Sequence, residues 1–396
     1  MVRRARSALA SAVIGMSLAS TACIAVLGLE KLSEEKKTAP GSDGGTGGTG
    51  ESGASETDAK CGDDFIDAES KPAAVDAGDA SDLVRYFAFN NLDLENGGFD
   101  LDHIVTIDEA TSSCSLPSGV PFASDPASGV DNATRGLLGV IGPALPAFNP
   151  TKINERLVNG DFGLLVGINN WNDTGTDDEV VVILYSTLGI WNGQMPKAPS
   201  KPPLGIVGDG DASDLWMPDR PVQLGSASNT AWVNDGKLVA RFTTLTLSIR
   251  SDLDVKLIDL VLQDAWLTAD LSPGPKMRLQ KGVLGGRVVV SDFLNEVRLL
   301  YTGIGYICSS STAMMTASKP MCGARDIRSK HCEDRQAMPC NALSFGARFE
   351  TYAVDQLGPP YEQEIEGGPY DQRNLLRPGQ RCLDAGDVDG AAVACP

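Results

Sequence analysis

An alternation of apolar and polar residues runs through the centre of the chain and predicts β-strands. In residues 244–250, three large apolar side chains face one side and polar side chains face the other. The alternation continues over residues 253–262 with a slip of one position between Leu257 and Ile258, which predicts a β-bulge. Apolar, β-branched runs predict further strands at 162–168, 179–185, 231–233, 237–241, 266–271, 276–280 and 286–290.

Turn and capping residues mark the ends of these elements. Asp235-Gly236 supplies the positive φ angles that a tight hairpin requires. Cap residues indicate where three short helices begin, and Pro150 and Gly160 frame the second of them. The predicted helices cover residues 131–145 after an Asp131 cap, 150–159 after Asn149, and 292–300 after Ser291.

These elements predict a mainly β protein: an antiparallel sandwich or barrel-like meander with a few short helices and a disulfide-rich C-terminal part. A parallel solenoid would need a constant repeat, and the turn signals recur at unequal spacing. Composition divides the chain into segments. They are a signal peptide at 1–22, an anchor-proximal segment at 23–35, a disordered Gly-rich tether at 36–60, an acidic lead-in at 61–82, a β-rich domain with N-terminal helices at 83–300 and a Cys-rich C-terminal part at 301–396.

The first residues are typical of an export signal. Three arginines precede an apolar stretch over residues 8–19, and small residues then lead to Cys23, the candidate for lipidation. A lipoprotein signal usually carries Leu where this chain has Ser20, so cleavage without lipidation is an alternative. The uncharged stretch totals about 22 residues, enough for an uncleaved anchor to span a bilayer. We expect an exported protein held at the outer membrane or cell surface by lipid, with a periplasmic or secreted protein as the alternative.

The number of cysteines agrees with export to an oxidising compartment. There are nine, and the eight that follow Cys23 can pair completely as disulfides. Eight cysteines allow 105 pairings, and the short loop between Cys382 and Cys395 favours that pair. Zinc is the alternative, but Cys-x-x-Cys knuckles are absent and His331 is the only histidine near the cluster. The predicted disulfide cysteines are Cys61, Cys114, Cys308, Cys322, Cys332, Cys340, Cys382 and Cys395.

The formal net charge of −19 excludes a nucleic-acid partner, because a phosphate backbone is bound by basic patches. We expect contact with the membrane through the N-terminal lipid, and a glycan or another envelope component as ligand. Calcium is the only cofactor that the sequence indicates, because alternating Asp and Gly in a loop can deliver the oxygens it requires. Asp209, Asp211 and Asp214 are the preferred calcium ligands, with an ordinary turn as the alternative.

Three tryptophans, Trp171, Trp191 and Trp216, lie in or beside predicted loops. A flat aromatic face in such a position can stack on a sugar ring, which makes these residues the candidate ligand-binding set. The alternative is that they close the open ends of the β structure as core residues.

No catalytic residue is assigned. The chain lacks Gly-x-Ser-x-Gly, His-Glu-x-x-His and a phosphate-cradling Gly-x-x-x-x-Gly-Lys. With 52 Asp and Glu residues, a pair of carboxylates at any chosen separation carries no information. His103, near Asp100 and Asp102, is predicted to be a surface residue rather than a base, so a non-enzymatic role is favoured.

Short segments across most of the chain resemble uncharacterised bacterial surface lipoproteins. They are Cys23-Ile24-Ala25-Val26-Leu27-Gly28-Leu29 with its tether, Gly98-Phe99-Asp100-Leu101-Asp102, Gly129-Val130-Asp131-Asn132, residues 232–239 and residues 282–287. The resemblance implies an exported, tethered, β-rich protein and no particular activity. We therefore expect a non-enzymatic envelope protein that displays a β-rich binding domain. The alternatives are a secreted carboxylate-dependent hydrolase acting on saccharides and an envelope lipid-binding protein.

Overall fold

The computed structural model describes residues 66, 70–74, 84–117, 124–141, 149–160, 162–190, 215–218, 225–250, 257–272, 277–298, 312–334, 337–358 and 395. Its strands are β1 (Arg85–Asp93), β2 (Gly163–Asn169), β3 (Val181–Ile190), β4 (Trp216–Pro218), β5 (Ser226–Ala227), β6 (Thr230–Asn234), β7 (Lys237–Arg250), β8 (Leu257–Ser272), β9 (Arg278–Val289) and β10 (Ala342–Val354). The helices are α1 (Thr134–Ile141), α2 (Pro150–Asn159), α3 (Val290–Val297) and α4 (Thr312–Gly323). The predicted mainly β fold with a few short helices is confirmed.

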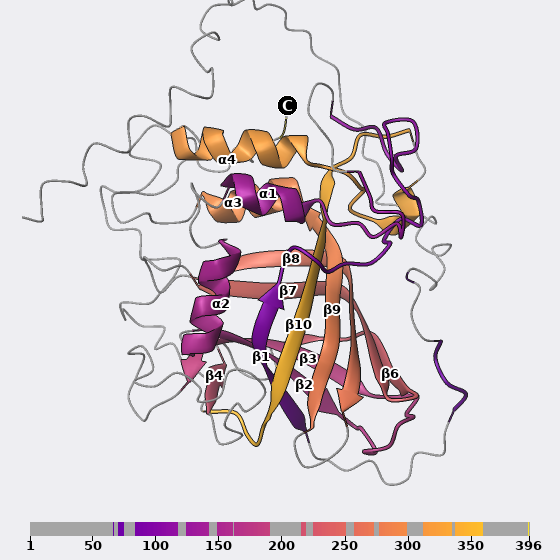
Figure 1. The fold of residues 1–396 in the computed structure, drawn as a ribbon, viewed down its shortest axis with the longest axis vertical. Coiled ribbons are helices and arrows are strands. Elements are labelled where there is room, and N and C mark those ends of the chain that lie inside the picture. Colours follow the sequence, from indigo (N-terminus) through magenta and orange to yellow (C-terminus); the bar gives the residue numbers. More distant parts are fainter. Residues whose placement is uncertain are drawn as a thin grey trace, which may run out of the picture. The chain divides into compact units, whose positions relative to one another are not determined.

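The strands form an antiparallel sheet in the order β4-β3-β2-β1-β10-β9-β8-β7-β6, curled into a half-barrel (Figure 1). Its two ends approach each other, because β5 pairs with β3 and an antiparallel bridge links Asp177 to Val233 in β6. That bridge has two backbone hydrogen bonds of 2.8 Å. The last strand, β10, lies between β1 and β9, so the C-terminal part of the chain contributes a central strand to the same sheet.

Two local predictions agree with the structure residue for residue. Helix α2 covers the predicted range: Asn149 Oδ1 accepts a hydrogen bond from the Lys152 backbone N–H at 3.2 Å, and Gly160 ends the helix at φ 66°. In the turn between β6 and β7, Asp235 and Gly236 have φ angles of 48° and 74°. Both elements are determined by residues that are adjacent in sequence.

The predicted caps of the other two helices are wrong. Helix α1 begins at Thr134, and the side chain that caps it is Asn132, whose Oδ1 accepts from the Arg135 backbone N–H at 3.2 Å. Asp131 instead pairs with another segment, as described below. Helix α3 begins at Val290, and the Ser291 side chain makes no cap hydrogen bond. In both cases tertiary packing moves the start of the helix.

Three of the strands are longer than predicted. Each of β7, β8 and β9 joins segments that the sequence pattern separates, because pairing with both neighbours carries the strand across the break in the pattern. The β-bulge in β8 lies at Asp264, which has a φ of 45°, and the register with β9 shifts there. The predicted bulge beside Leu257 is therefore misplaced by several residues.

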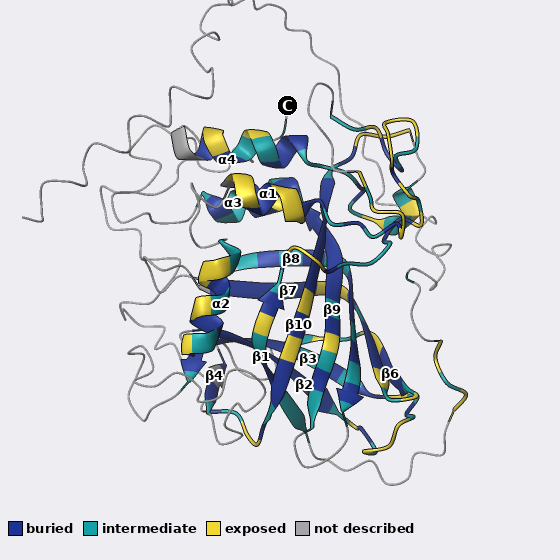
Figure 2. Cartoon of the chain, in the orientation of Figure 1, coloured by how far each residue is buried: buried dark blue, intermediate teal, exposed yellow. Residues whose placement is uncertain are grey.

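The hydrophobic core fills the inside of the half-barrel and continues under the helices (Figure 2). Helices α1 and α3 both pack against α4 and against the sheet, and α2 packs on β1. An apolar cavity of about 40 Å³ lies in this core, with Leu137, Ile153, Leu247, Phe293 and Phe345 among its lining side chains. A cavity that binds benzene measures about 150 Å³. This cavity, formed by described residues, is thus too small for an acyl chain and offers no support for the lipid-binding alternative.

Disulfides join Cys114 to Cys340 and Cys322 to Cys395, and Cys332 is also disulfide-bonded. The disulfide prediction is confirmed for these five cysteines, which leaves them no thiolate to offer to zinc. The predicted pair Cys382–Cys395 is wrong, because Cys395 bonds to Cys322 near the end of α4. Tertiary contact, rather than the length of the loop, decides which sulfur atoms meet.

None of the helices within the described ranges combines the length and the hydropathy needed to cross a membrane. Several predicted features lie outside those ranges. They are the leader with Cys23, the tether, Cys61, Cys308, Cys382, Trp191 and the acidic set Asp209, Asp211 and Asp214.

Candidate functional site

Two acidic segments that are far apart in the sequence meet above the sheet. The Asp131 backbone N–H donates to the Phe99 carbonyl oxygen at 2.9 Å, in an antiparallel bridge between the two segments. The segments are Gly98–Asp102 and Gly129–Asn132. Gly129 has a φ of 73°, and a Cβ atom on it would lie 2.7 Å from Asp100 Oδ2. Glycine is therefore needed where the two segments touch.

The Asn132 side chain holds the loop beside β10, and two glycines allow its backbone to approach that strand closely. The Asn132 side-chain N–H₂ group donates to the carbonyl oxygens of Gly97 at 2.8 Å and Gly346 at 3.1 Å. A Cβ atom on Gly346 would lie 2.2 Å from the Gly97 carbonyl oxygen, so the two backbones pass closer than any other residue would allow. The loop is thus fixed to a central strand rather than to a flexible edge.

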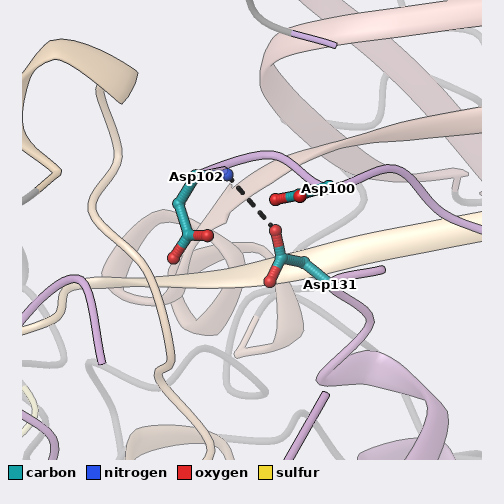
Figure 3. Close-up of side chains that lie close together, drawn as sticks. All are labelled: Asp100, Asp102 and Asp131. Atoms are coloured by element: carbon teal, nitrogen blue, oxygen red, sulfur yellow. Dashed lines mark hydrogen bonds between the residues drawn. The ribbon is translucent and has the colours of Figure 1, made fainter. Parts of the chain in front are cut away.

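Three carboxylates converge at this junction. Each of Asp100, Asp102 and Asp131 offers an oxygen that lies within 4.8 Å of those of the other two. Figure 3 shows Asp102 and Asp131 facing each other with Asp100 beside them. The exposed fraction is only 4% for Asp102 and 2% for Asp131. We call these three residues the aspartate triad.

A buried arginine holds the triad loop from below. Arg287 in β9 is 1% exposed, and its Nη2 donates to the Leu101 carbonyl oxygen at 2.5 Å. Nη1 of the same side chain donates to the Arg328 carbonyl oxygen at 2.8 Å. Nη2 also lies 2.6 Å from Asp334 Oδ2, in an ion pair buried on both sides. Leu101, between two triad residues, is therefore tied to the sheet through a charged hydrogen bond.

A polar cleft adjoins the triad. Its volume is about 580 Å³, which lies within the range of small-molecule sites. Segments 95–97 and 124–136 form much of its wall. Its charged lining residues are Glu95, Asp125, Asp326, Arg135 and Arg348. Because both signs of charge and several hydrogen-bonding groups line it, the cleft suits a polar ligand better than an apolar one.

Two of the carboxylates in the cleft have pKa values shifted towards neutrality. Burial raises the pKa of Asp326 to about 7, against the hydrogen bonds that it accepts from the Ser344 hydroxyl and backbone N–H. Burial likewise raises the pKa of Asp125 to about 6, against a hydrogen bond from the Thr106 backbone N–H. The charge of Asp102 raises both values further. In the triad itself, burial and then the Asp102 charge raise the pKa of Asp131 well above its ordinary value.

The raised pKa of Asp326 predicts a stability that falls as the pH rises. Its pKa is about 7 in the folded protein and 3.8 as the model-peptide value, so the unfolded chain loses its proton first. Stability from this group is complete below about pH 4 and is lost as the pH rises through 7. One pKa unit corresponds to about 1.4 kcal/mol. The difference of about three pKa units therefore predicts that Asp326→Asn is more stable than the wild type by about 4 kcal/mol at pH 8, with no difference near pH 4.

Urea unfolding at several pH values in the presence of EDTA would test this expectation. The negative charges of Asp125 and Asp102 also raise the pKa of Asp326. The positively charged groups in the same cleft are Arg135 and Arg348. The Asn side chain keeps an acceptor for the Ser344 backbone N–H, and the Ser344 hydroxyl, which donates to Asp326, would instead accept from the Asn N–H₂ group. Asp355→Asn, at an exposed position just after β10, is the control. A difference between Asp326→Asn and wild type that is the same at pH 4 and pH 8 would contradict the prediction.

The structure corrects the prediction that tryptophans form the ligand-binding surface. Trp216 is completely buried and its indole N–H donates to the Tyr352 hydroxyl at 2.8 Å. Trp171 is 5% exposed, and its indole N–H donates to the Thr174 carbonyl oxygen at 3.0 Å. Neither ring offers a free face for stacking on a sugar. Both are core residues, the alternative that the sequence left open.

The two histidines are placed as follows. His103 is exposed and has a φ of 58°, in agreement with its prediction as a surface residue. His331 is largely buried, with its Nδ1 lying 2.8 Å from Asp264 Oδ2 at the β8 bulge. That contact lowers the pKa of the Asp264 carboxyl, against the effect of burial. Since Cys332 is disulfide-bonded, His331 has no neighbouring thiolate with which to share a metal.

Comparisons of this chain with models of protein families, with curated proteins and with solved structures found no match. The chemistry of the site therefore rests on its own geometry.

Proposed function

We propose that this protein is an exported, lipid-anchored component of the bacterial cell envelope that binds a saccharide-like polar ligand in the cleft beside the aspartate triad. The observation that carries the binding role is the cleft itself, with a volume of about 580 Å³ and charges of both signs. Hydroxyl groups of a sugar both donate and accept hydrogen bonds, and such a lining provides partners for each. The absence of a recognisable catalytic motif in the sequence favours binding over catalysis.

Export and anchoring are the second part of the proposal. Disulfides persist in oxidising compartments and are rare in the cytosol, so the bonds Cys114–Cys340 and Cys322–Cys395 support export. The leader and Cys23 then favour a lipid anchor. The intact mass of the native mature protein is the test. Acylation of Cys23 and the loss of disulfide hydrogens are expected, whereas an unprocessed leader with reduced cysteines contradicts export.

Ligand binding can be tested on an array of envelope saccharides with the purified protein. Arg348 in β10 is exposed and lines the cleft, so Arg348→Ala should weaken saccharide binding about tenfold through the loss of a charged hydrogen bond. The matched control is Lys281→Ala, which removes an exposed cation from β9 that does not line the cleft. Equal losses in the two variants, or no saccharide bound by the wild type, would count against this function.

A carboxylate-dependent hydrolase is the second candidate, and one observation favours it. Asp125 and Asp326 line the same cleft, with pKa values raised to about 6 and about 7. A carboxyl group that keeps its proton near neutral pH can act as a general acid towards a glycosidic oxygen. Hydrolysis of a saccharide by the wild type, lost in Asp125→Asn, would favour this candidate. Binding without turnover would favour the first.

A further inference from the structure

Two of the three triad side chains present buried oxygens that no described residue satisfies. Asp102 Oδ1 accepts from the Ile104 backbone N–H at 2.9 Å, but Asp102 Oδ2 accepts no hydrogen bond from the described part of the chain. Asp100 Oδ1 is likewise buried without a hydrogen bond there. Asp131 Oδ2 is engaged, accepting from the Leu101 backbone N–H at 2.6 Å and from that of Asp102 at 3.3 Å. A buried carboxylate oxygen with no partner is costly, and such atoms usually indicate an absent ligand or water.

The charge of the triad is little compensated: burial raises the pKa of Asp100, and the neighbouring His103 opposes this rise only in part. Among the described residues, Asp100, Asp102 and Asp131 take part in no ion pair. The closest guanidinium contact of this loop is that of Arg287 with Leu101 O, and Arg287 is already paired with Asp334. Three carboxylates with oxygens within 4.8 Å of one another repel each other unless they share a proton or a bound cation, and a cation would also give the unpaired oxygens a partner.

We propose that Asp100, Asp102 and Asp131 bind one calcium ion. This site goes beyond the proposed function and stands whether or not the cleft binds a saccharide. Asp102 is the central ligand, because it is 4% exposed, its Oδ2 is buried without a hydrogen bond in the described part of the chain, and its carboxylate lies beside those of the other two aspartates (Figure 3).

The ligand set favours calcium over the other common divalent cations. All the donors are oxygen, whereas zinc prefers the nitrogen and sulfur of His and Cys. Ligands on opposite sides of a calcium ion lie about 4.8 Å apart, and those of a magnesium ion about 4.1 Å apart. The triad oxygens lie within 4.8 Å of one another, close enough to share one ion of either kind. The three carboxylates favour calcium, because magnesium usually binds through one or two carboxylates and keeps several waters. Three carboxylates supply up to six oxygens, and water can complete the shell.

Calcium at this position would join the two segments that form the edge of the cleft. Asp100 and Asp102 follow the 95–97 wall of the cleft, and Asp131 lies within the 124–136 wall. The protein holds these walls together with the Phe99–Asp131 bridge and the Asn132 side chain. An ion shared by the three carboxylates would add a cross-link of much greater strength at the same place.

The test uses the purified full-length protein, freed of metal with EDTA and titrated with calcium chloride in a calorimeter. We expect one calcium per chain, with a dissociation constant on the order of 10⁻⁴ M or tighter and weaker binding of magnesium. Calcium should also raise the midpoint of thermal unfolding by several degrees, since it binds only the folded chain. Asp102→Asn keeps the acceptor for Ile104 but loses one ligand charge, and should weaken calcium binding at least tenfold.

Two control variants make the outcome decisive. Glu109→Gln removes an exposed negative charge from the same loop and should leave calcium affinity unchanged. Asp211→Asn, in the acidic loop that the sequence favoured, should also leave it unchanged. If Asp102→Asn does not fold, Asp100→Asn replaces it at a half-buried position. Calcium binding that is insensitive to both triad variants but lost in Asp211→Asn, or no calcium binding at roughly 1 mM, overturns the proposal.

Discussion

Replacing Arg287 with methionine is expected to lower the free energy of unfolding by about 3–5 kcal/mol. Arg287 is 1% exposed, and its partner Asp334 has a side chain that is 5% exposed. Methionine fills much of the same volume but leaves the Asp334 carboxyl buried beside no positive charge. The carbonyl oxygens of Leu101 and Arg328 also lose their donor. Breaking a buried pair from one side is more costly than losing an exposed pair.

Guanidinium chloride unfolding of the wild type and the variant measures this loss. Lys281→Met is the matched control, because it removes a cation from the same strand at a side chain that is 83% exposed, and it should cost less than about 0.5 kcal/mol. The double variant Arg287→Met/Asp334→Asn should recover part of the loss, since the uncompensated carboxylate is then removed. A cost below about 1 kcal/mol for Arg287→Met would show that the buried pair does not anchor the triad loop.

The parts of the fold that follow from the sequence are those set by neighbouring residues. Helix α2 is bounded by Asn149, Pro150 and Gly160, and each of these residues acts on the backbone next to it. The β6–β7 turn similarly needs only Asp235 and Gly236. The predictions failed where partners distant in sequence decide the outcome. Cys395 meets Cys322 across 73 residues, and no local pattern carries that information.

The aspartate triad illustrates the same limit for the site. Asp100 and Asp102 form a recognisable pair in the sequence, but Asp131 reaches them only through the bridge to Phe99. The loops that looked more favourable for calcium were those with several aspartates close together in sequence. The sequence feature that marks these two segments is a glycine in each. Gly98 and Gly129 both have positive φ angles beside the triad. Such glycines indicate that another part of the backbone approaches closely, but the sequence does not show which segment it is.

Burial explains why the tryptophan prediction failed. A tryptophan beside a predicted loop has the same sequence signature whether its ring points outwards or inwards. Trp216 lies on β4, next to Gly163, where a Cβ atom would lie 2.4 Å from the indole ring. The absence of a side chain at Gly163 makes room for the ring inside the fold. Only the folded sheet reveals this, because Gly163 on β2 and Trp216 on β4 are distant in sequence and lie on either side of β3.

Removal of the Cys114–Cys340 disulfide is expected to have the other large effect on stability. The double variant Cys114→Ser/Cys340→Ser should lose about 2–5 kcal/mol of unfolding free energy. The bond closes a loop with a sequence separation of 226 residues, and both cysteines are buried. It also reinforces backbone hydrogen bonds from Ser115 N to Met338 O and from Cys340 N to Ser115 O, each 2.9 Å long. The unfolded chain gains freedom when this loop opens.

The second disulfide tests whether the length of the closed loop determines the loss of stability. Cys322–Cys395 spans 73 residues rather than 226, so the chain-entropy model makes it weaker by about 1 kcal/mol. Denaturant unfolding of Cys322→Ser/Cys395→Ser beside the first double variant measures this difference. Cys114 lies between Asp102 and Asp131 in the sequence, so loss of the longer bond should also weaken calcium binding, whereas loss of the shorter bond should not. Equal stability losses with unchanged calcium affinity would mean that Cys114–Cys340 does not hold the triad loop in place.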